Sequence, residues 1–182
     1  MTGASARIHI VGASGSGTTT LGVALAAATG AAHLDTDNFF WMPTDPPFTT
    51  RRPVDERLQL LTAGLDRHAA WVLTGSLLDW GNVFIPRFTL VVFLCLPPDI
   101  RIERLRQRER QRYGNAIDPG GRMHASHSEF IAWAKRYDDP AFEGRSLARH
   151  RAWLELLPCP VVEILGTPSV EESVARVLAA AA

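Results

Sequence analysis

The sequence contains almost no lysine. Lys135 is the single lysine in a chain whose Lys and Arg residues together number 19, against 19 Asp and Glu residues. The resulting formal net charge of zero excludes the strong positive field that is typical of proteins that bind nucleic acids or anionic membrane surfaces. We therefore expect no nucleic-acid partner and no membrane partner, and any cationic site has to be built locally from arginine.

Long apolar segments and a cysteine framework are also missing. No apolar run approaches the roughly 20 residues that span a bilayer, and the N-terminal "MTGASARIHIV" lacks a basic region followed by a long apolar stretch. Cys95 and Cys159 lie within or beside apolar segments, where a reduced thiol behaves as a small hydrophobic group. The sequence therefore predicts a cytoplasmic protein. Its 182 residues, 46% of them hydrophobic, predict a single domain over residues 1–182.

Short apolar segments rich in Val, Ile, Leu and Phe recur along the chain. They lie at residues 7–13, 31–37, 69–76, 88–96 and 159–166. Their continuous hydrophobicity is typical of strands buried on both faces. Helical patterns separate them, which predicts an α/β fold with a parallel sheet, helices on both faces and ligands beyond the carboxyl ends of the strands.

Capping residues place the ends of two of these helices. Gly30 follows an Ala- and Leu-rich stretch and is expected to end the first helix. Thr167 is expected to be the N-cap of the last helix, with Pro168 at its first helical position.

The segment "GASGSGTT", residues 12–19, follows the first predicted strand and opens the first predicted helix. It matches the phosphate-binding pattern G-x-x-x-x-G-K-[ST] at each fixed position except the lysine, which is replaced by Thr18. The alternative is a tight strand-to-helix turn without a ligand. In the phosphate-binding interpretation, backbone N–H groups bind the phosphates of ATP and the Thr19 hydroxyl binds Mg²⁺. The candidate nucleotide-binding residues here are Gly12, Ala13, Ser14, Gly15, Ser16, Gly17, Thr18 and Thr19.

The replaced lysine affects binding and catalysis differently. Its absence removes one charge-assisted hydrogen bond to phosphate, which corresponds to about 10- to 100-fold in affinity. The same cation stabilises the charge on a phosphoryl group in flight, so its loss is felt most in the transition state. Two hypotheses follow: another cation replaces the lysine, or the protein binds nucleotide as a regulator without turnover.

Arginine recurs at helical spacing in "PDIRIERLRQRERQR", residues 98–112. Arg101, Arg104, Arg108 and Arg112 are separated by three, four and four residues and therefore share one helix face. Guanidinium groups bind phosphates bidentately and keep their charge, so the cluster indicates phosphate binding. For any single arginine, a solvated helix face is the alternative.

Turn-forming residues follow this helix at 118–121, in the order Asp, Pro, Gly, Gly. They predict a mobile flap whose closure would bring Arg122, Lys135 or Arg136 onto the nucleotide while excluding water.

Acidic residues follow the second predicted strand. Asp35 and Asp37 flank Thr36, so in an extended segment both carboxylates project to the same side. One would hold Mg²⁺ through water, and the other would accept a proton or a hydrogen bond from an acceptor hydroxyl. The alternative is that one of them caps the following turn or helix. Neither the strand at 69–76 nor the one at 88–96 ends in an acid, which assigns the metal role to Asp35.

Two further sets of residues are candidates for the acceptor site. Phe39, Phe40 and Trp41 either wall an acceptor pocket or belong to the core. Gly75 and Ser76 follow the third strand at the same edge of the sheet, where glycine permits close approach of a ligand.

Taken in order, "GASGSGTTTLG", "HLDTD", "WVLTGS" and "LVVFLCLPPDIRIERLRQRE", followed by the arginine-bearing flap, resemble the adenylate kinase-like branch of P-loop kinases. That branch includes nucleoside monophosphate kinases, shikimate and gluconate kinases, and topology-modulation-protein-like sequences. The resemblance implies a five-stranded parallel sheet in the order 2-3-1-4-5. It also implies ATP with Mg²⁺ and an arginine-rich lid at about residues 113–128.

The resemblance also implies residue roles. "DTD" is similar to the shikimate kinase segment, which gives Asp35 a metal-side role and Asp37 an acceptor contact. Arg104 and Arg108 resemble the arginines that lead into the lid, and Arg136 resembles one on the helix that leaves it. The chain departs from the pattern at Thr18 and at Thr74, where nucleoside monophosphate kinases have an aspartate.

The function predicted from these features is an ATP- and Mg²⁺-dependent phosphotransferase in which lid arginines replace the lysine. Its acceptor is a small molecule or a nucleotide whose identity stays open, as does the oligomeric state.

Overall fold

The computed structural model describes residues 6–181. Its strands form one five-stranded sheet in the order β2-β3-β1-β4-β5, and every neighbouring pair is parallel. This confirms the predicted strand order and the predicted α/β class. The elements are β1 (Arg7–Gly12), α1 (Thr18–Thr29), β2 (Ala32–Asp35), α2 (Asp37–Phe40), α3 (Val54–Asp66), β3 (Trp71–Thr74), the 3₁₀ helix η1 (Asn82–Arg87), β4 (Leu90–Cys95), α4 (Pro98–Tyr113), η2 (Gly114–Ile117), α5 (His124–Lys135), η3 (Arg136–Asp138), α6 (Leu147–Leu154), β5 (Val161–Leu165) and α7 (Val170–Ala180).

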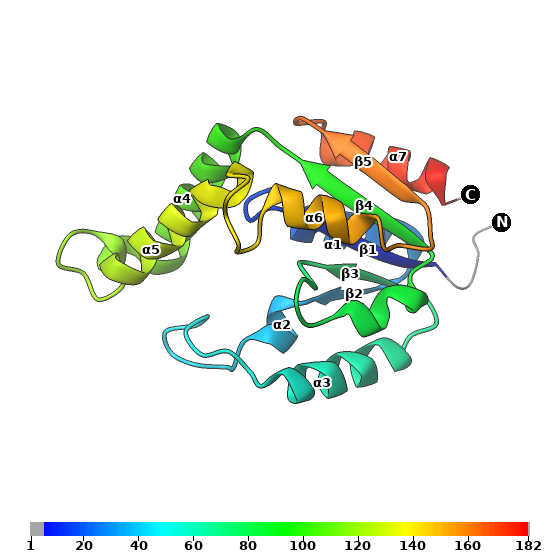
Figure 1. The fold of residues 1–182 in the computed structure, drawn as a ribbon, viewed down its shortest axis with the longest axis horizontal. Coiled ribbons are helices and arrows are strands. Elements are labelled where there is room, and N and C mark those ends of the chain that lie inside the picture. Colours follow the sequence, from blue (N-terminus) through cyan, green and yellow to red (C-terminus); the bar gives the residue numbers. More distant parts are fainter. Residues whose placement is uncertain (1–5, 182) are drawn as a thin grey trace.

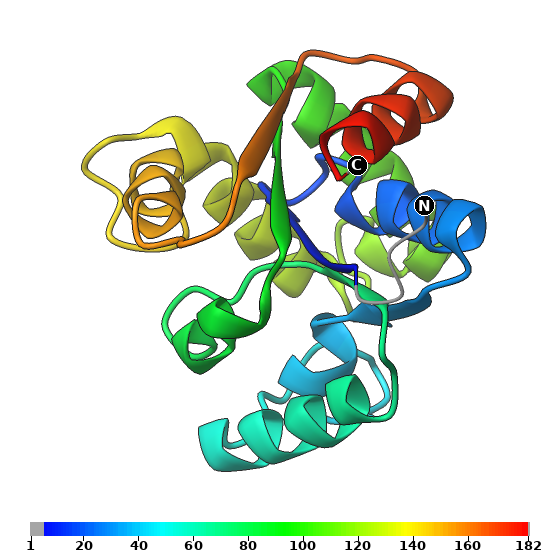
Figure 2. The same cartoon turned by 90° about the vertical axis from the view of Figure 1, so that its right-hand side faces the viewer.

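The sheet forms the middle of three layers (Figure 2). Side chains alternate along β1, so Ile8 and Ile10 pack in one buried cluster with α1 and α7. Val11 belongs to the other buried cluster, which includes side chains of α3, η1 and α6. Both faces of the central strands are covered by apolar side chains, which explains why their sequences are continuously hydrophobic.

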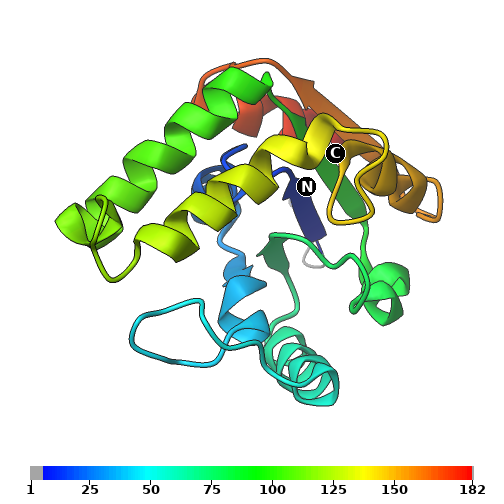
Figure 3. The same ribbon diagram turned by 60° about the vertical axis from the view of Figure 1, so that its left-hand side comes forward.

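The helices α4 and α5 form a hairpin that projects from the end of the sheet at which the strands finish (Figures 1 and 3). Ile102 and Leu105 of α4 pack with Ile131 and Ala134 of α5 in a separate buried cluster. The predicted lid, residues 113–128, lies at the tip of this hairpin and contains the end of α4, η2 and the start of α5. The arginine-rich segment is therefore one arm of a packed helical hairpin.

One helix end is confirmed and one helix start is wrong. Gly30 is the C-cap of α1 with φ of 70°, a left-handed conformation that glycine adopts without strain. The last helix begins after Ser169, two residues later than the predicted N-cap Thr167. The reason is a capping box, in which Glu172 N donates to Ser169 Oγ at 3.1 Å and Ser169 N donates to the Glu172 carboxylate at 2.8 Å. Pro168 consequently precedes the helix.

The predicted domain span includes residues 1–5 and 182, which lie outside the described residues. Between residues 6 and 181, no helix is both long and apolar enough to cross a membrane.

Candidate active site

The loop between β1 and α1 has a backbone that only glycine fits at several positions. A Cβ atom on Gly12 would lie 2.8 Å from the carbonyl oxygen of Leu94, and one on Gly15 would lie 2.5 Å from that of Arg101. Gly15 and Gly17 also have φ of 83° and 93°, in the left-handed region. The loop is therefore wedged between the ends of β4 and α4, and its curvature follows from the glycine spacing in the sequence.

Hydrogen-bond donors of this loop are left without partners. Ser16 N donates to Ala13 O at 3.1 Å and Leu21 N to Gly17 O at 3.0 Å. For the backbone N–H groups of Gly15, Gly17, Thr18 and Thr19, no acceptor is found in residues 6–181.

A side chain of the same loop is also unpaired. The Ser16 hydroxyl is buried, and it has no partner in the part of the chain that the structure describes. A row of free N–H groups at a helix N-terminus, together with a buried free hydroxyl, fits the oxygen atoms of a polyphosphate.

The structure brings Thr19 and Asp35 together. Thr19 Oγ1 donates to Asp35 Oδ2 at 2.8 Å, and Asp37 N donates to Asp35 Oδ1 at 3.0 Å. Asp35 therefore faces the loop hydroxyl and also holds the turn into α2, which was the alternative to a metal role, and the metal role itself stays a prediction. A hydroxyl and a carboxylate oxygen at this spacing match the oxygen ligands that Mg²⁺ prefers.

Asp37 lies in an environment suited to a proton acceptor. Asp37 keeps part of its surface exposed, but the protein around its carboxyl removes water from it, which raises its pKa above the ordinary value, and the charge of Asp35 raises the pKa further. The guanidinium groups of Arg145 and Arg108 and a hydrogen bond with Trp41 oppose this increase. A carboxylate with a raised pKa accepts a proton more readily than an ordinary aspartate.

Two of the four arginines spaced along α4 face the site. Arg104 Nη1 lies 3.7 Å from the position that a Cβ atom on Gly17 would occupy, so its charge is next to the phosphate loop. Arg108 is close enough to Asp37 for their charges to interact, and burial lowers the pKa of its guanidinium. These two are the arginines that the resemblance placed at the start of the lid.

The other two arginines of that face have partners elsewhere. The Arg101 side chain is only 1% exposed, pairs with Asp138 and donates from Nε to Leu96 O at 3.2 Å. The Arg112 guanidinium lies 4.4 Å from the centroid of the Phe48 ring. Arg101 is thus a structural residue, while the predicted nucleotide contact of Arg112 stays a prediction.

Among the described residues, no hydrogen bond joins the phosphate loop to the three cations that flap closure is predicted to bring onto the nucleotide. Arg136 pairs with Asp139 at 3.5 Å and its guanidinium lies 4.3 Å from the centroid of the Phe142 ring. Lys135 and Arg122 are exposed. The predicted catalytic role of Arg136 remains a prediction that its contacts in this structure do not favour.

Arg145 reaches the site although no sequence pattern singles it out. Its Nη2 donates to Ser14 Oγ in the phosphate loop at 3.0 Å, and its guanidinium lies 4.9 Å from the centroid of the Trp133 ring. Burial lowers its pKa, while the charge of Asp37 raises it. Arg145 lies in the loop before α6, in "FEGRSL", where one arginine looks like any other surface residue. Only the folded chain, which closes a loop of more than a hundred residues, puts it at the phosphate loop.

Arg57 was also missed. It is 8% exposed, its guanidinium carbon lies 3.9 Å from the centroid of the Phe40 ring, and its Nε donates to Arg52 O at 2.6 Å. Within residues 6–181 no carboxylate pairs with it, whereas Arg52 is paired with Glu56 at 3.5 Å. Burial and the charge of Arg51 lower its pKa. A buried cation without an acidic partner is a candidate for binding an anion.

The aromatic residues after β2 divide between core and site. Phe39 and Phe40 are half-buried and pack against the cluster beneath α3. Trp41 contacts both the Phe40 ring and the Phe48 ring, at centroid distances of 4.9 and 6.2 Å. These rings therefore connect the core to the loop that carries Phe48.

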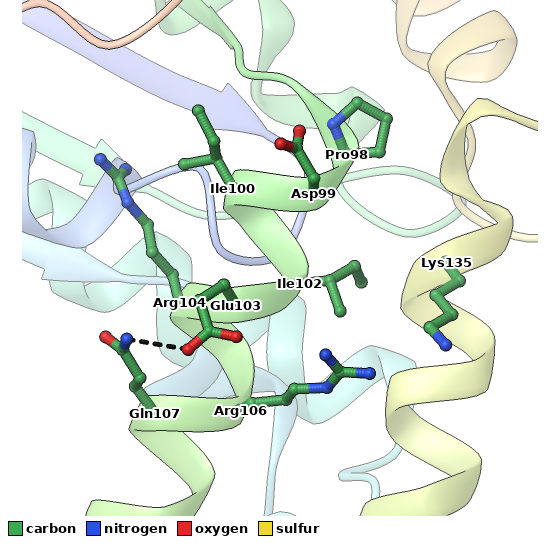
Figure 4. A pocket seen from close by; sticks show the side chains of 9 residues that line it. All are labelled: Pro98, Asp99, Ile100, Ile102, Glu103, Arg104, Arg106, Gln107 and Lys135. Atoms are coloured by element: carbon green, nitrogen blue, oxygen red, sulfur yellow. Dashed lines mark hydrogen bonds between the residues drawn. The ribbon is translucent and has the colours of Figure 1, made fainter.

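A groove of about 670 Å³ follows the outer face of α4 (Figure 4). Arg104 is at one side of it, and Lys135 of α5 is at the other. Because Arg104 also lies against the phosphate loop, the groove and the loop share this side chain.

Comparison with known proteins assigns the chain to a family. The family model described as "AAA domain" matches residues 8–122. The chain is 47% identical over 171 residues to a Bacillus subtilis (strain 168) protein described as "Uncharacterized protein YqaC", and the match covers 94% of each chain.

Solved structures share the fold at low sequence identity. The shikimate kinase from Acinetobacter baumannii in complex with shikimate has a TM-score of 0.57 at 16% identity, covering 96% of this chain and 91% of that one. The shikimate kinase from Bacteroides thetaiotaomicron has a TM-score of 0.56 at 20% identity, covering 96% and 97%. A gluconokinase from Sinorhizobium meliloti 1021 has a TM-score of 0.50 at 20% identity, covering 97% and 91%. The chain has the fold of P-loop kinases, and by the match over residues 8–122 it belongs to the AAA domain family.

Proposed function

We propose that the protein is a phosphotransferase that moves the γ-phosphoryl group of ATP, with Mg²⁺, to a small-molecule acceptor. The observation that carries this proposal is the contact of Arg145 with Ser14 of the phosphate loop at 3.0 Å, made by a cation that also interacts with Asp37. A positive charge is thus held between the loop that binds phosphate and the carboxylate suited to accept a proton.

Arg145 and Arg104 together supply the positive charge that is missing because Thr18 replaces the lysine. They approach the loop from different elements, one beside Ser14 and the other beside Gly17. Guanidinium groups stay charged at every relevant pH and bind phosphate oxygens in pairs. Two such groups are a reasonable replacement for one ammonium group in stabilising the charge on a phosphoryl group in flight.

The other residues of the site are assigned to Mg²⁺ binding, phosphate binding and proton transfer. Thr19 and Asp35 would hold Mg²⁺, directly or through water, and the free N–H groups of Gly15, Gly17, Thr18 and Thr19 would hold the phosphates. ATP supplies the phosphoryl group and Mg²⁺ neutralises charge on its oxygens. Asp37 takes the proton of the acceptor hydroxyl as that oxygen bonds to phosphorus and the bond from phosphorus to ADP breaks.

The acceptor is proposed to carry an anionic group. Arg57 is buried beside Phe40 and has no acidic partner among the described residues, so a bound anion would compensate its charge. The fold relatives that are named for shikimate and gluconate make these two compounds the first acceptors to try.

The test is ADP formation from MgATP with a panel of shikimate, D-gluconate, AMP and CMP. We expect activity with at least one of them, and we expect Arg145→Ala to lower kcat/KM about 10- to 100-fold, the effect of losing one charge-assisted hydrogen bond. Arg151→Ala is the matched control, because Arg151 pairs with Glu163 away from the loop.

The variant Thr18→Lys distinguishes a kinase from the alternative, a nucleotide-binding regulator without turnover. If the parent protein binds MgATP but forms no ADP with any acceptor, and Thr18→Lys creates turnover, the protein is a nucleotide-binding regulator and the kinase proposal is wrong.

A further inference from the structure

A serine after β3, a histidine of α6 and a tyrosine of η3 form a hydrogen-bonded chain. Ser76 Oγ lies 3.3 Å from His150 Nε2, and His150 Nδ1 lies 2.7 Å from the Tyr137 hydroxyl. His150 is fully buried and Tyr137 is 6% exposed, whereas Ser76 is only partly buried. The chain therefore runs from the interior outward to Ser76.

Ser76 lies at the edge of the sheet at which α/β proteins bind their ligands. It follows β3 by two residues, at the carboxyl edge of the sheet. The intervening Gly75 has φ of 104°, and a Cβ atom there would collide with the Thr36 hydroxyl, which lies between the two aspartates of β2 and α2. Gly75 N also donates to Ile10 O at 3.0 Å, just before the phosphate loop. Gly75, which directly precedes Ser76, is thus held between Thr36 and the end of β1.

The direction of the hydrogen bonds can be inferred. Burial lowers the pKa of His150 to about 3, so the ring is neutral and has one donor and one acceptor nitrogen. Burial also raises the pKa of Tyr137, so the tyrosine keeps its proton, and His150 Nδ1 is the one acceptor within reach of it in residues 6–181. Nδ1 therefore accepts from Tyr137, and Nε2–H donates to Ser76 Oγ.

This direction leaves a free donor at the site. Ser76 Oγ accepts from His150 and, at 3.4 Å, from Leu78 N. Both lone pairs of Ser76 Oγ are then used, and no described residue accepts its own hydrogen. We infer that Ser76 donates this hydrogen to an oxygen atom of the phosphate acceptor, and that His150 and Tyr137 are positioning residues that fix its direction.

The consequence is a specificity rule for the proposed kinase, on which this inference rests. The acceptor must present a hydrogen-bond-accepting oxygen, in a hydroxyl, carboxylate or phosphate, at the end of β3. An analogue with a hydrogen or methyl group there leaves the Ser76 donor unpaired and is rejected.

The first measurement reads the hydrogen-bond direction directly. In the ¹⁵N-labelled full-length chain, a long-range ¹H–¹⁵N correlation spectrum at neutral pH is expected to show His150 as the Nε2–H tautomer, with the signal assigned by its loss in His150→Gln. The Nδ1–H tautomer would overturn the inference, because Ser76 would then donate to the ring and not to a ligand.

The second measurement uses the most active acceptor of the shikimate, D-gluconate, AMP and CMP panel. Ser76→Ala is expected to raise the KM of that acceptor about five- to tenfold, the effect of one lost hydrogen bond, with the KM of ATP unchanged. Ser76→Thr keeps the hydroxyl and is expected to restore most of the affinity. Ser173→Ala on α7 removes another hydrogen-bonded hydroxyl, that of Ser173 to Ser169 O, and is the matched control with no change in KM.

The variant Tyr137→Phe tests whether Tyr137 positions the Ser76 hydroxyl or only stabilises the fold. It is expected to raise the acceptor KM in the parent and to have no further effect on KM in the Ser76→Ala background, since Tyr137 acts through Ser76. Equal effects in both backgrounds, or an unchanged acceptor KM in Ser76→Ala, would refute the inference while leaving the kinase intact. A parent protein that forms no ADP with any acceptor would instead refute the proposed function, and the inference with it.

Discussion

The phosphate loop with its neighbouring carboxylates, residues 12–37, and the segment that returns from the hairpin, residues 136–150, meet at one site but are built differently. The first is held by short-range contacts, such as the hydrogen bond from Thr19 to Asp35 across 16 residues. The second is held by contacts between distant segments, including Arg145 to Ser14 and His150 to Ser76. We call it the return segment. The comparison shows which part of a site a sequence pattern can reveal and which part only the fold creates.

The largest expected effect is the loss of stability at acid pH that comes from two buried histidines, His9 on β1, just before the phosphate loop, and His150 in the return segment. Burial lowers the pKa of His9 on β1 from 6.5 to about 4, and that of His150 from 6.5 to about 3. Both pKa values are depressed by folding, so the unfolded chain binds protons first. The stability is fully present above pH 6.5 and is lost as the pH falls toward the folded values.

Between pH 7 and pH 5 the two histidines are expected to remove about 4 kcal/mol from the free energy of unfolding. Urea unfolding at a series of pH values measures this loss. His150→Gln should roughly halve the slope below pH 6.5, whereas His68→Gln, at an exposed position, should leave it unchanged. Equal slopes for His150→Gln and the parent would mean that the return segment is not closed around a neutral histidine.

The second prediction breaks the phosphate loop alone. Gly15→Val forces a side chain into left-handed backbone and against the Arg101 carbonyl, so MgATP binding in isothermal titration should weaken at least about 100-fold. Gly30→Ala is the matched control: φ there is 70°, but a Cβ atom would meet nothing within 4 Å. It should cost about 1 kcal/mol of stability and leave MgATP affinity unchanged. Similar affinities for the two variants would show that the loop tolerates widening.

These two predictions also mark the limit of sequence analysis. The strand order, the glycine loop and the pairing of Thr19 with Asp35 were predictable, because each depends on a local pattern or on which strand ends share an edge. Arg145 and Ser76 gain their partners from contacts across 131 and 74 residues, which no local pattern records. Conversely, the helical spacing grouped Arg101 with the arginines predicted to bind phosphate. Its side chain is instead buried and paired with Asp138, so it does not serve that role.

The third prediction tests how the return segment is anchored. Asp138 pairs with Arg101, whose side chain is 1% exposed, so Asp138→Asn leaves a buried charge uncompensated. Because Asp138 is itself 37% exposed, the loss of unfolding free energy is expected to be only about 1–2 kcal/mol. MgATP affinity should fall as well, since the freed segment holds Arg145 less firmly.

Asp139→Asn is the matched control for this variant. Asp139 is similarly exposed, at 41%, and pairs at 3.5 Å with Arg136, which is 55% exposed. It is expected to change the free energy of unfolding by less than about 0.5 kcal/mol. If Asp138→Asn destabilises the protein but leaves MgATP affinity intact, Arg145 is positioned by its own contacts with Ser14 and Trp133 and not by the anchor.

The smallest expected effect concerns a third region, the loop between α2 and α3, residues 41–53, which we call the acceptor loop and which contacts the hairpin. Arg112 lies 4.4 Å from the Phe48 ring centroid and the Tyr113 hydroxyl donates to Pro47 O at 3.4 Å, so the end of α4 contacts this loop. Phe48→Leu keeps an apolar side chain but removes the cation–π contact, which is worth about 0.5–1 kcal/mol at an exposed position. The KM of the acceptor should therefore rise about two- to fivefold, with the KM of ATP unchanged.

Phe142→Leu removes the same kind of contact, at 4.3 Å from Arg136, in the return segment. It is expected to leave the acceptor KM unchanged, because Phe142 meets the edge of Trp133, whose ring lies beside Arg145, and is not part of the acceptor loop. Steady-state kinetics of the two variants decides whether equal cation–π contacts have unequal consequences. A rise in acceptor KM for Phe142→Leu as large as for Phe48→Leu would mean that the hairpin responds as one rigid body, and that the acceptor loop and the return segment are not independent parts of the site.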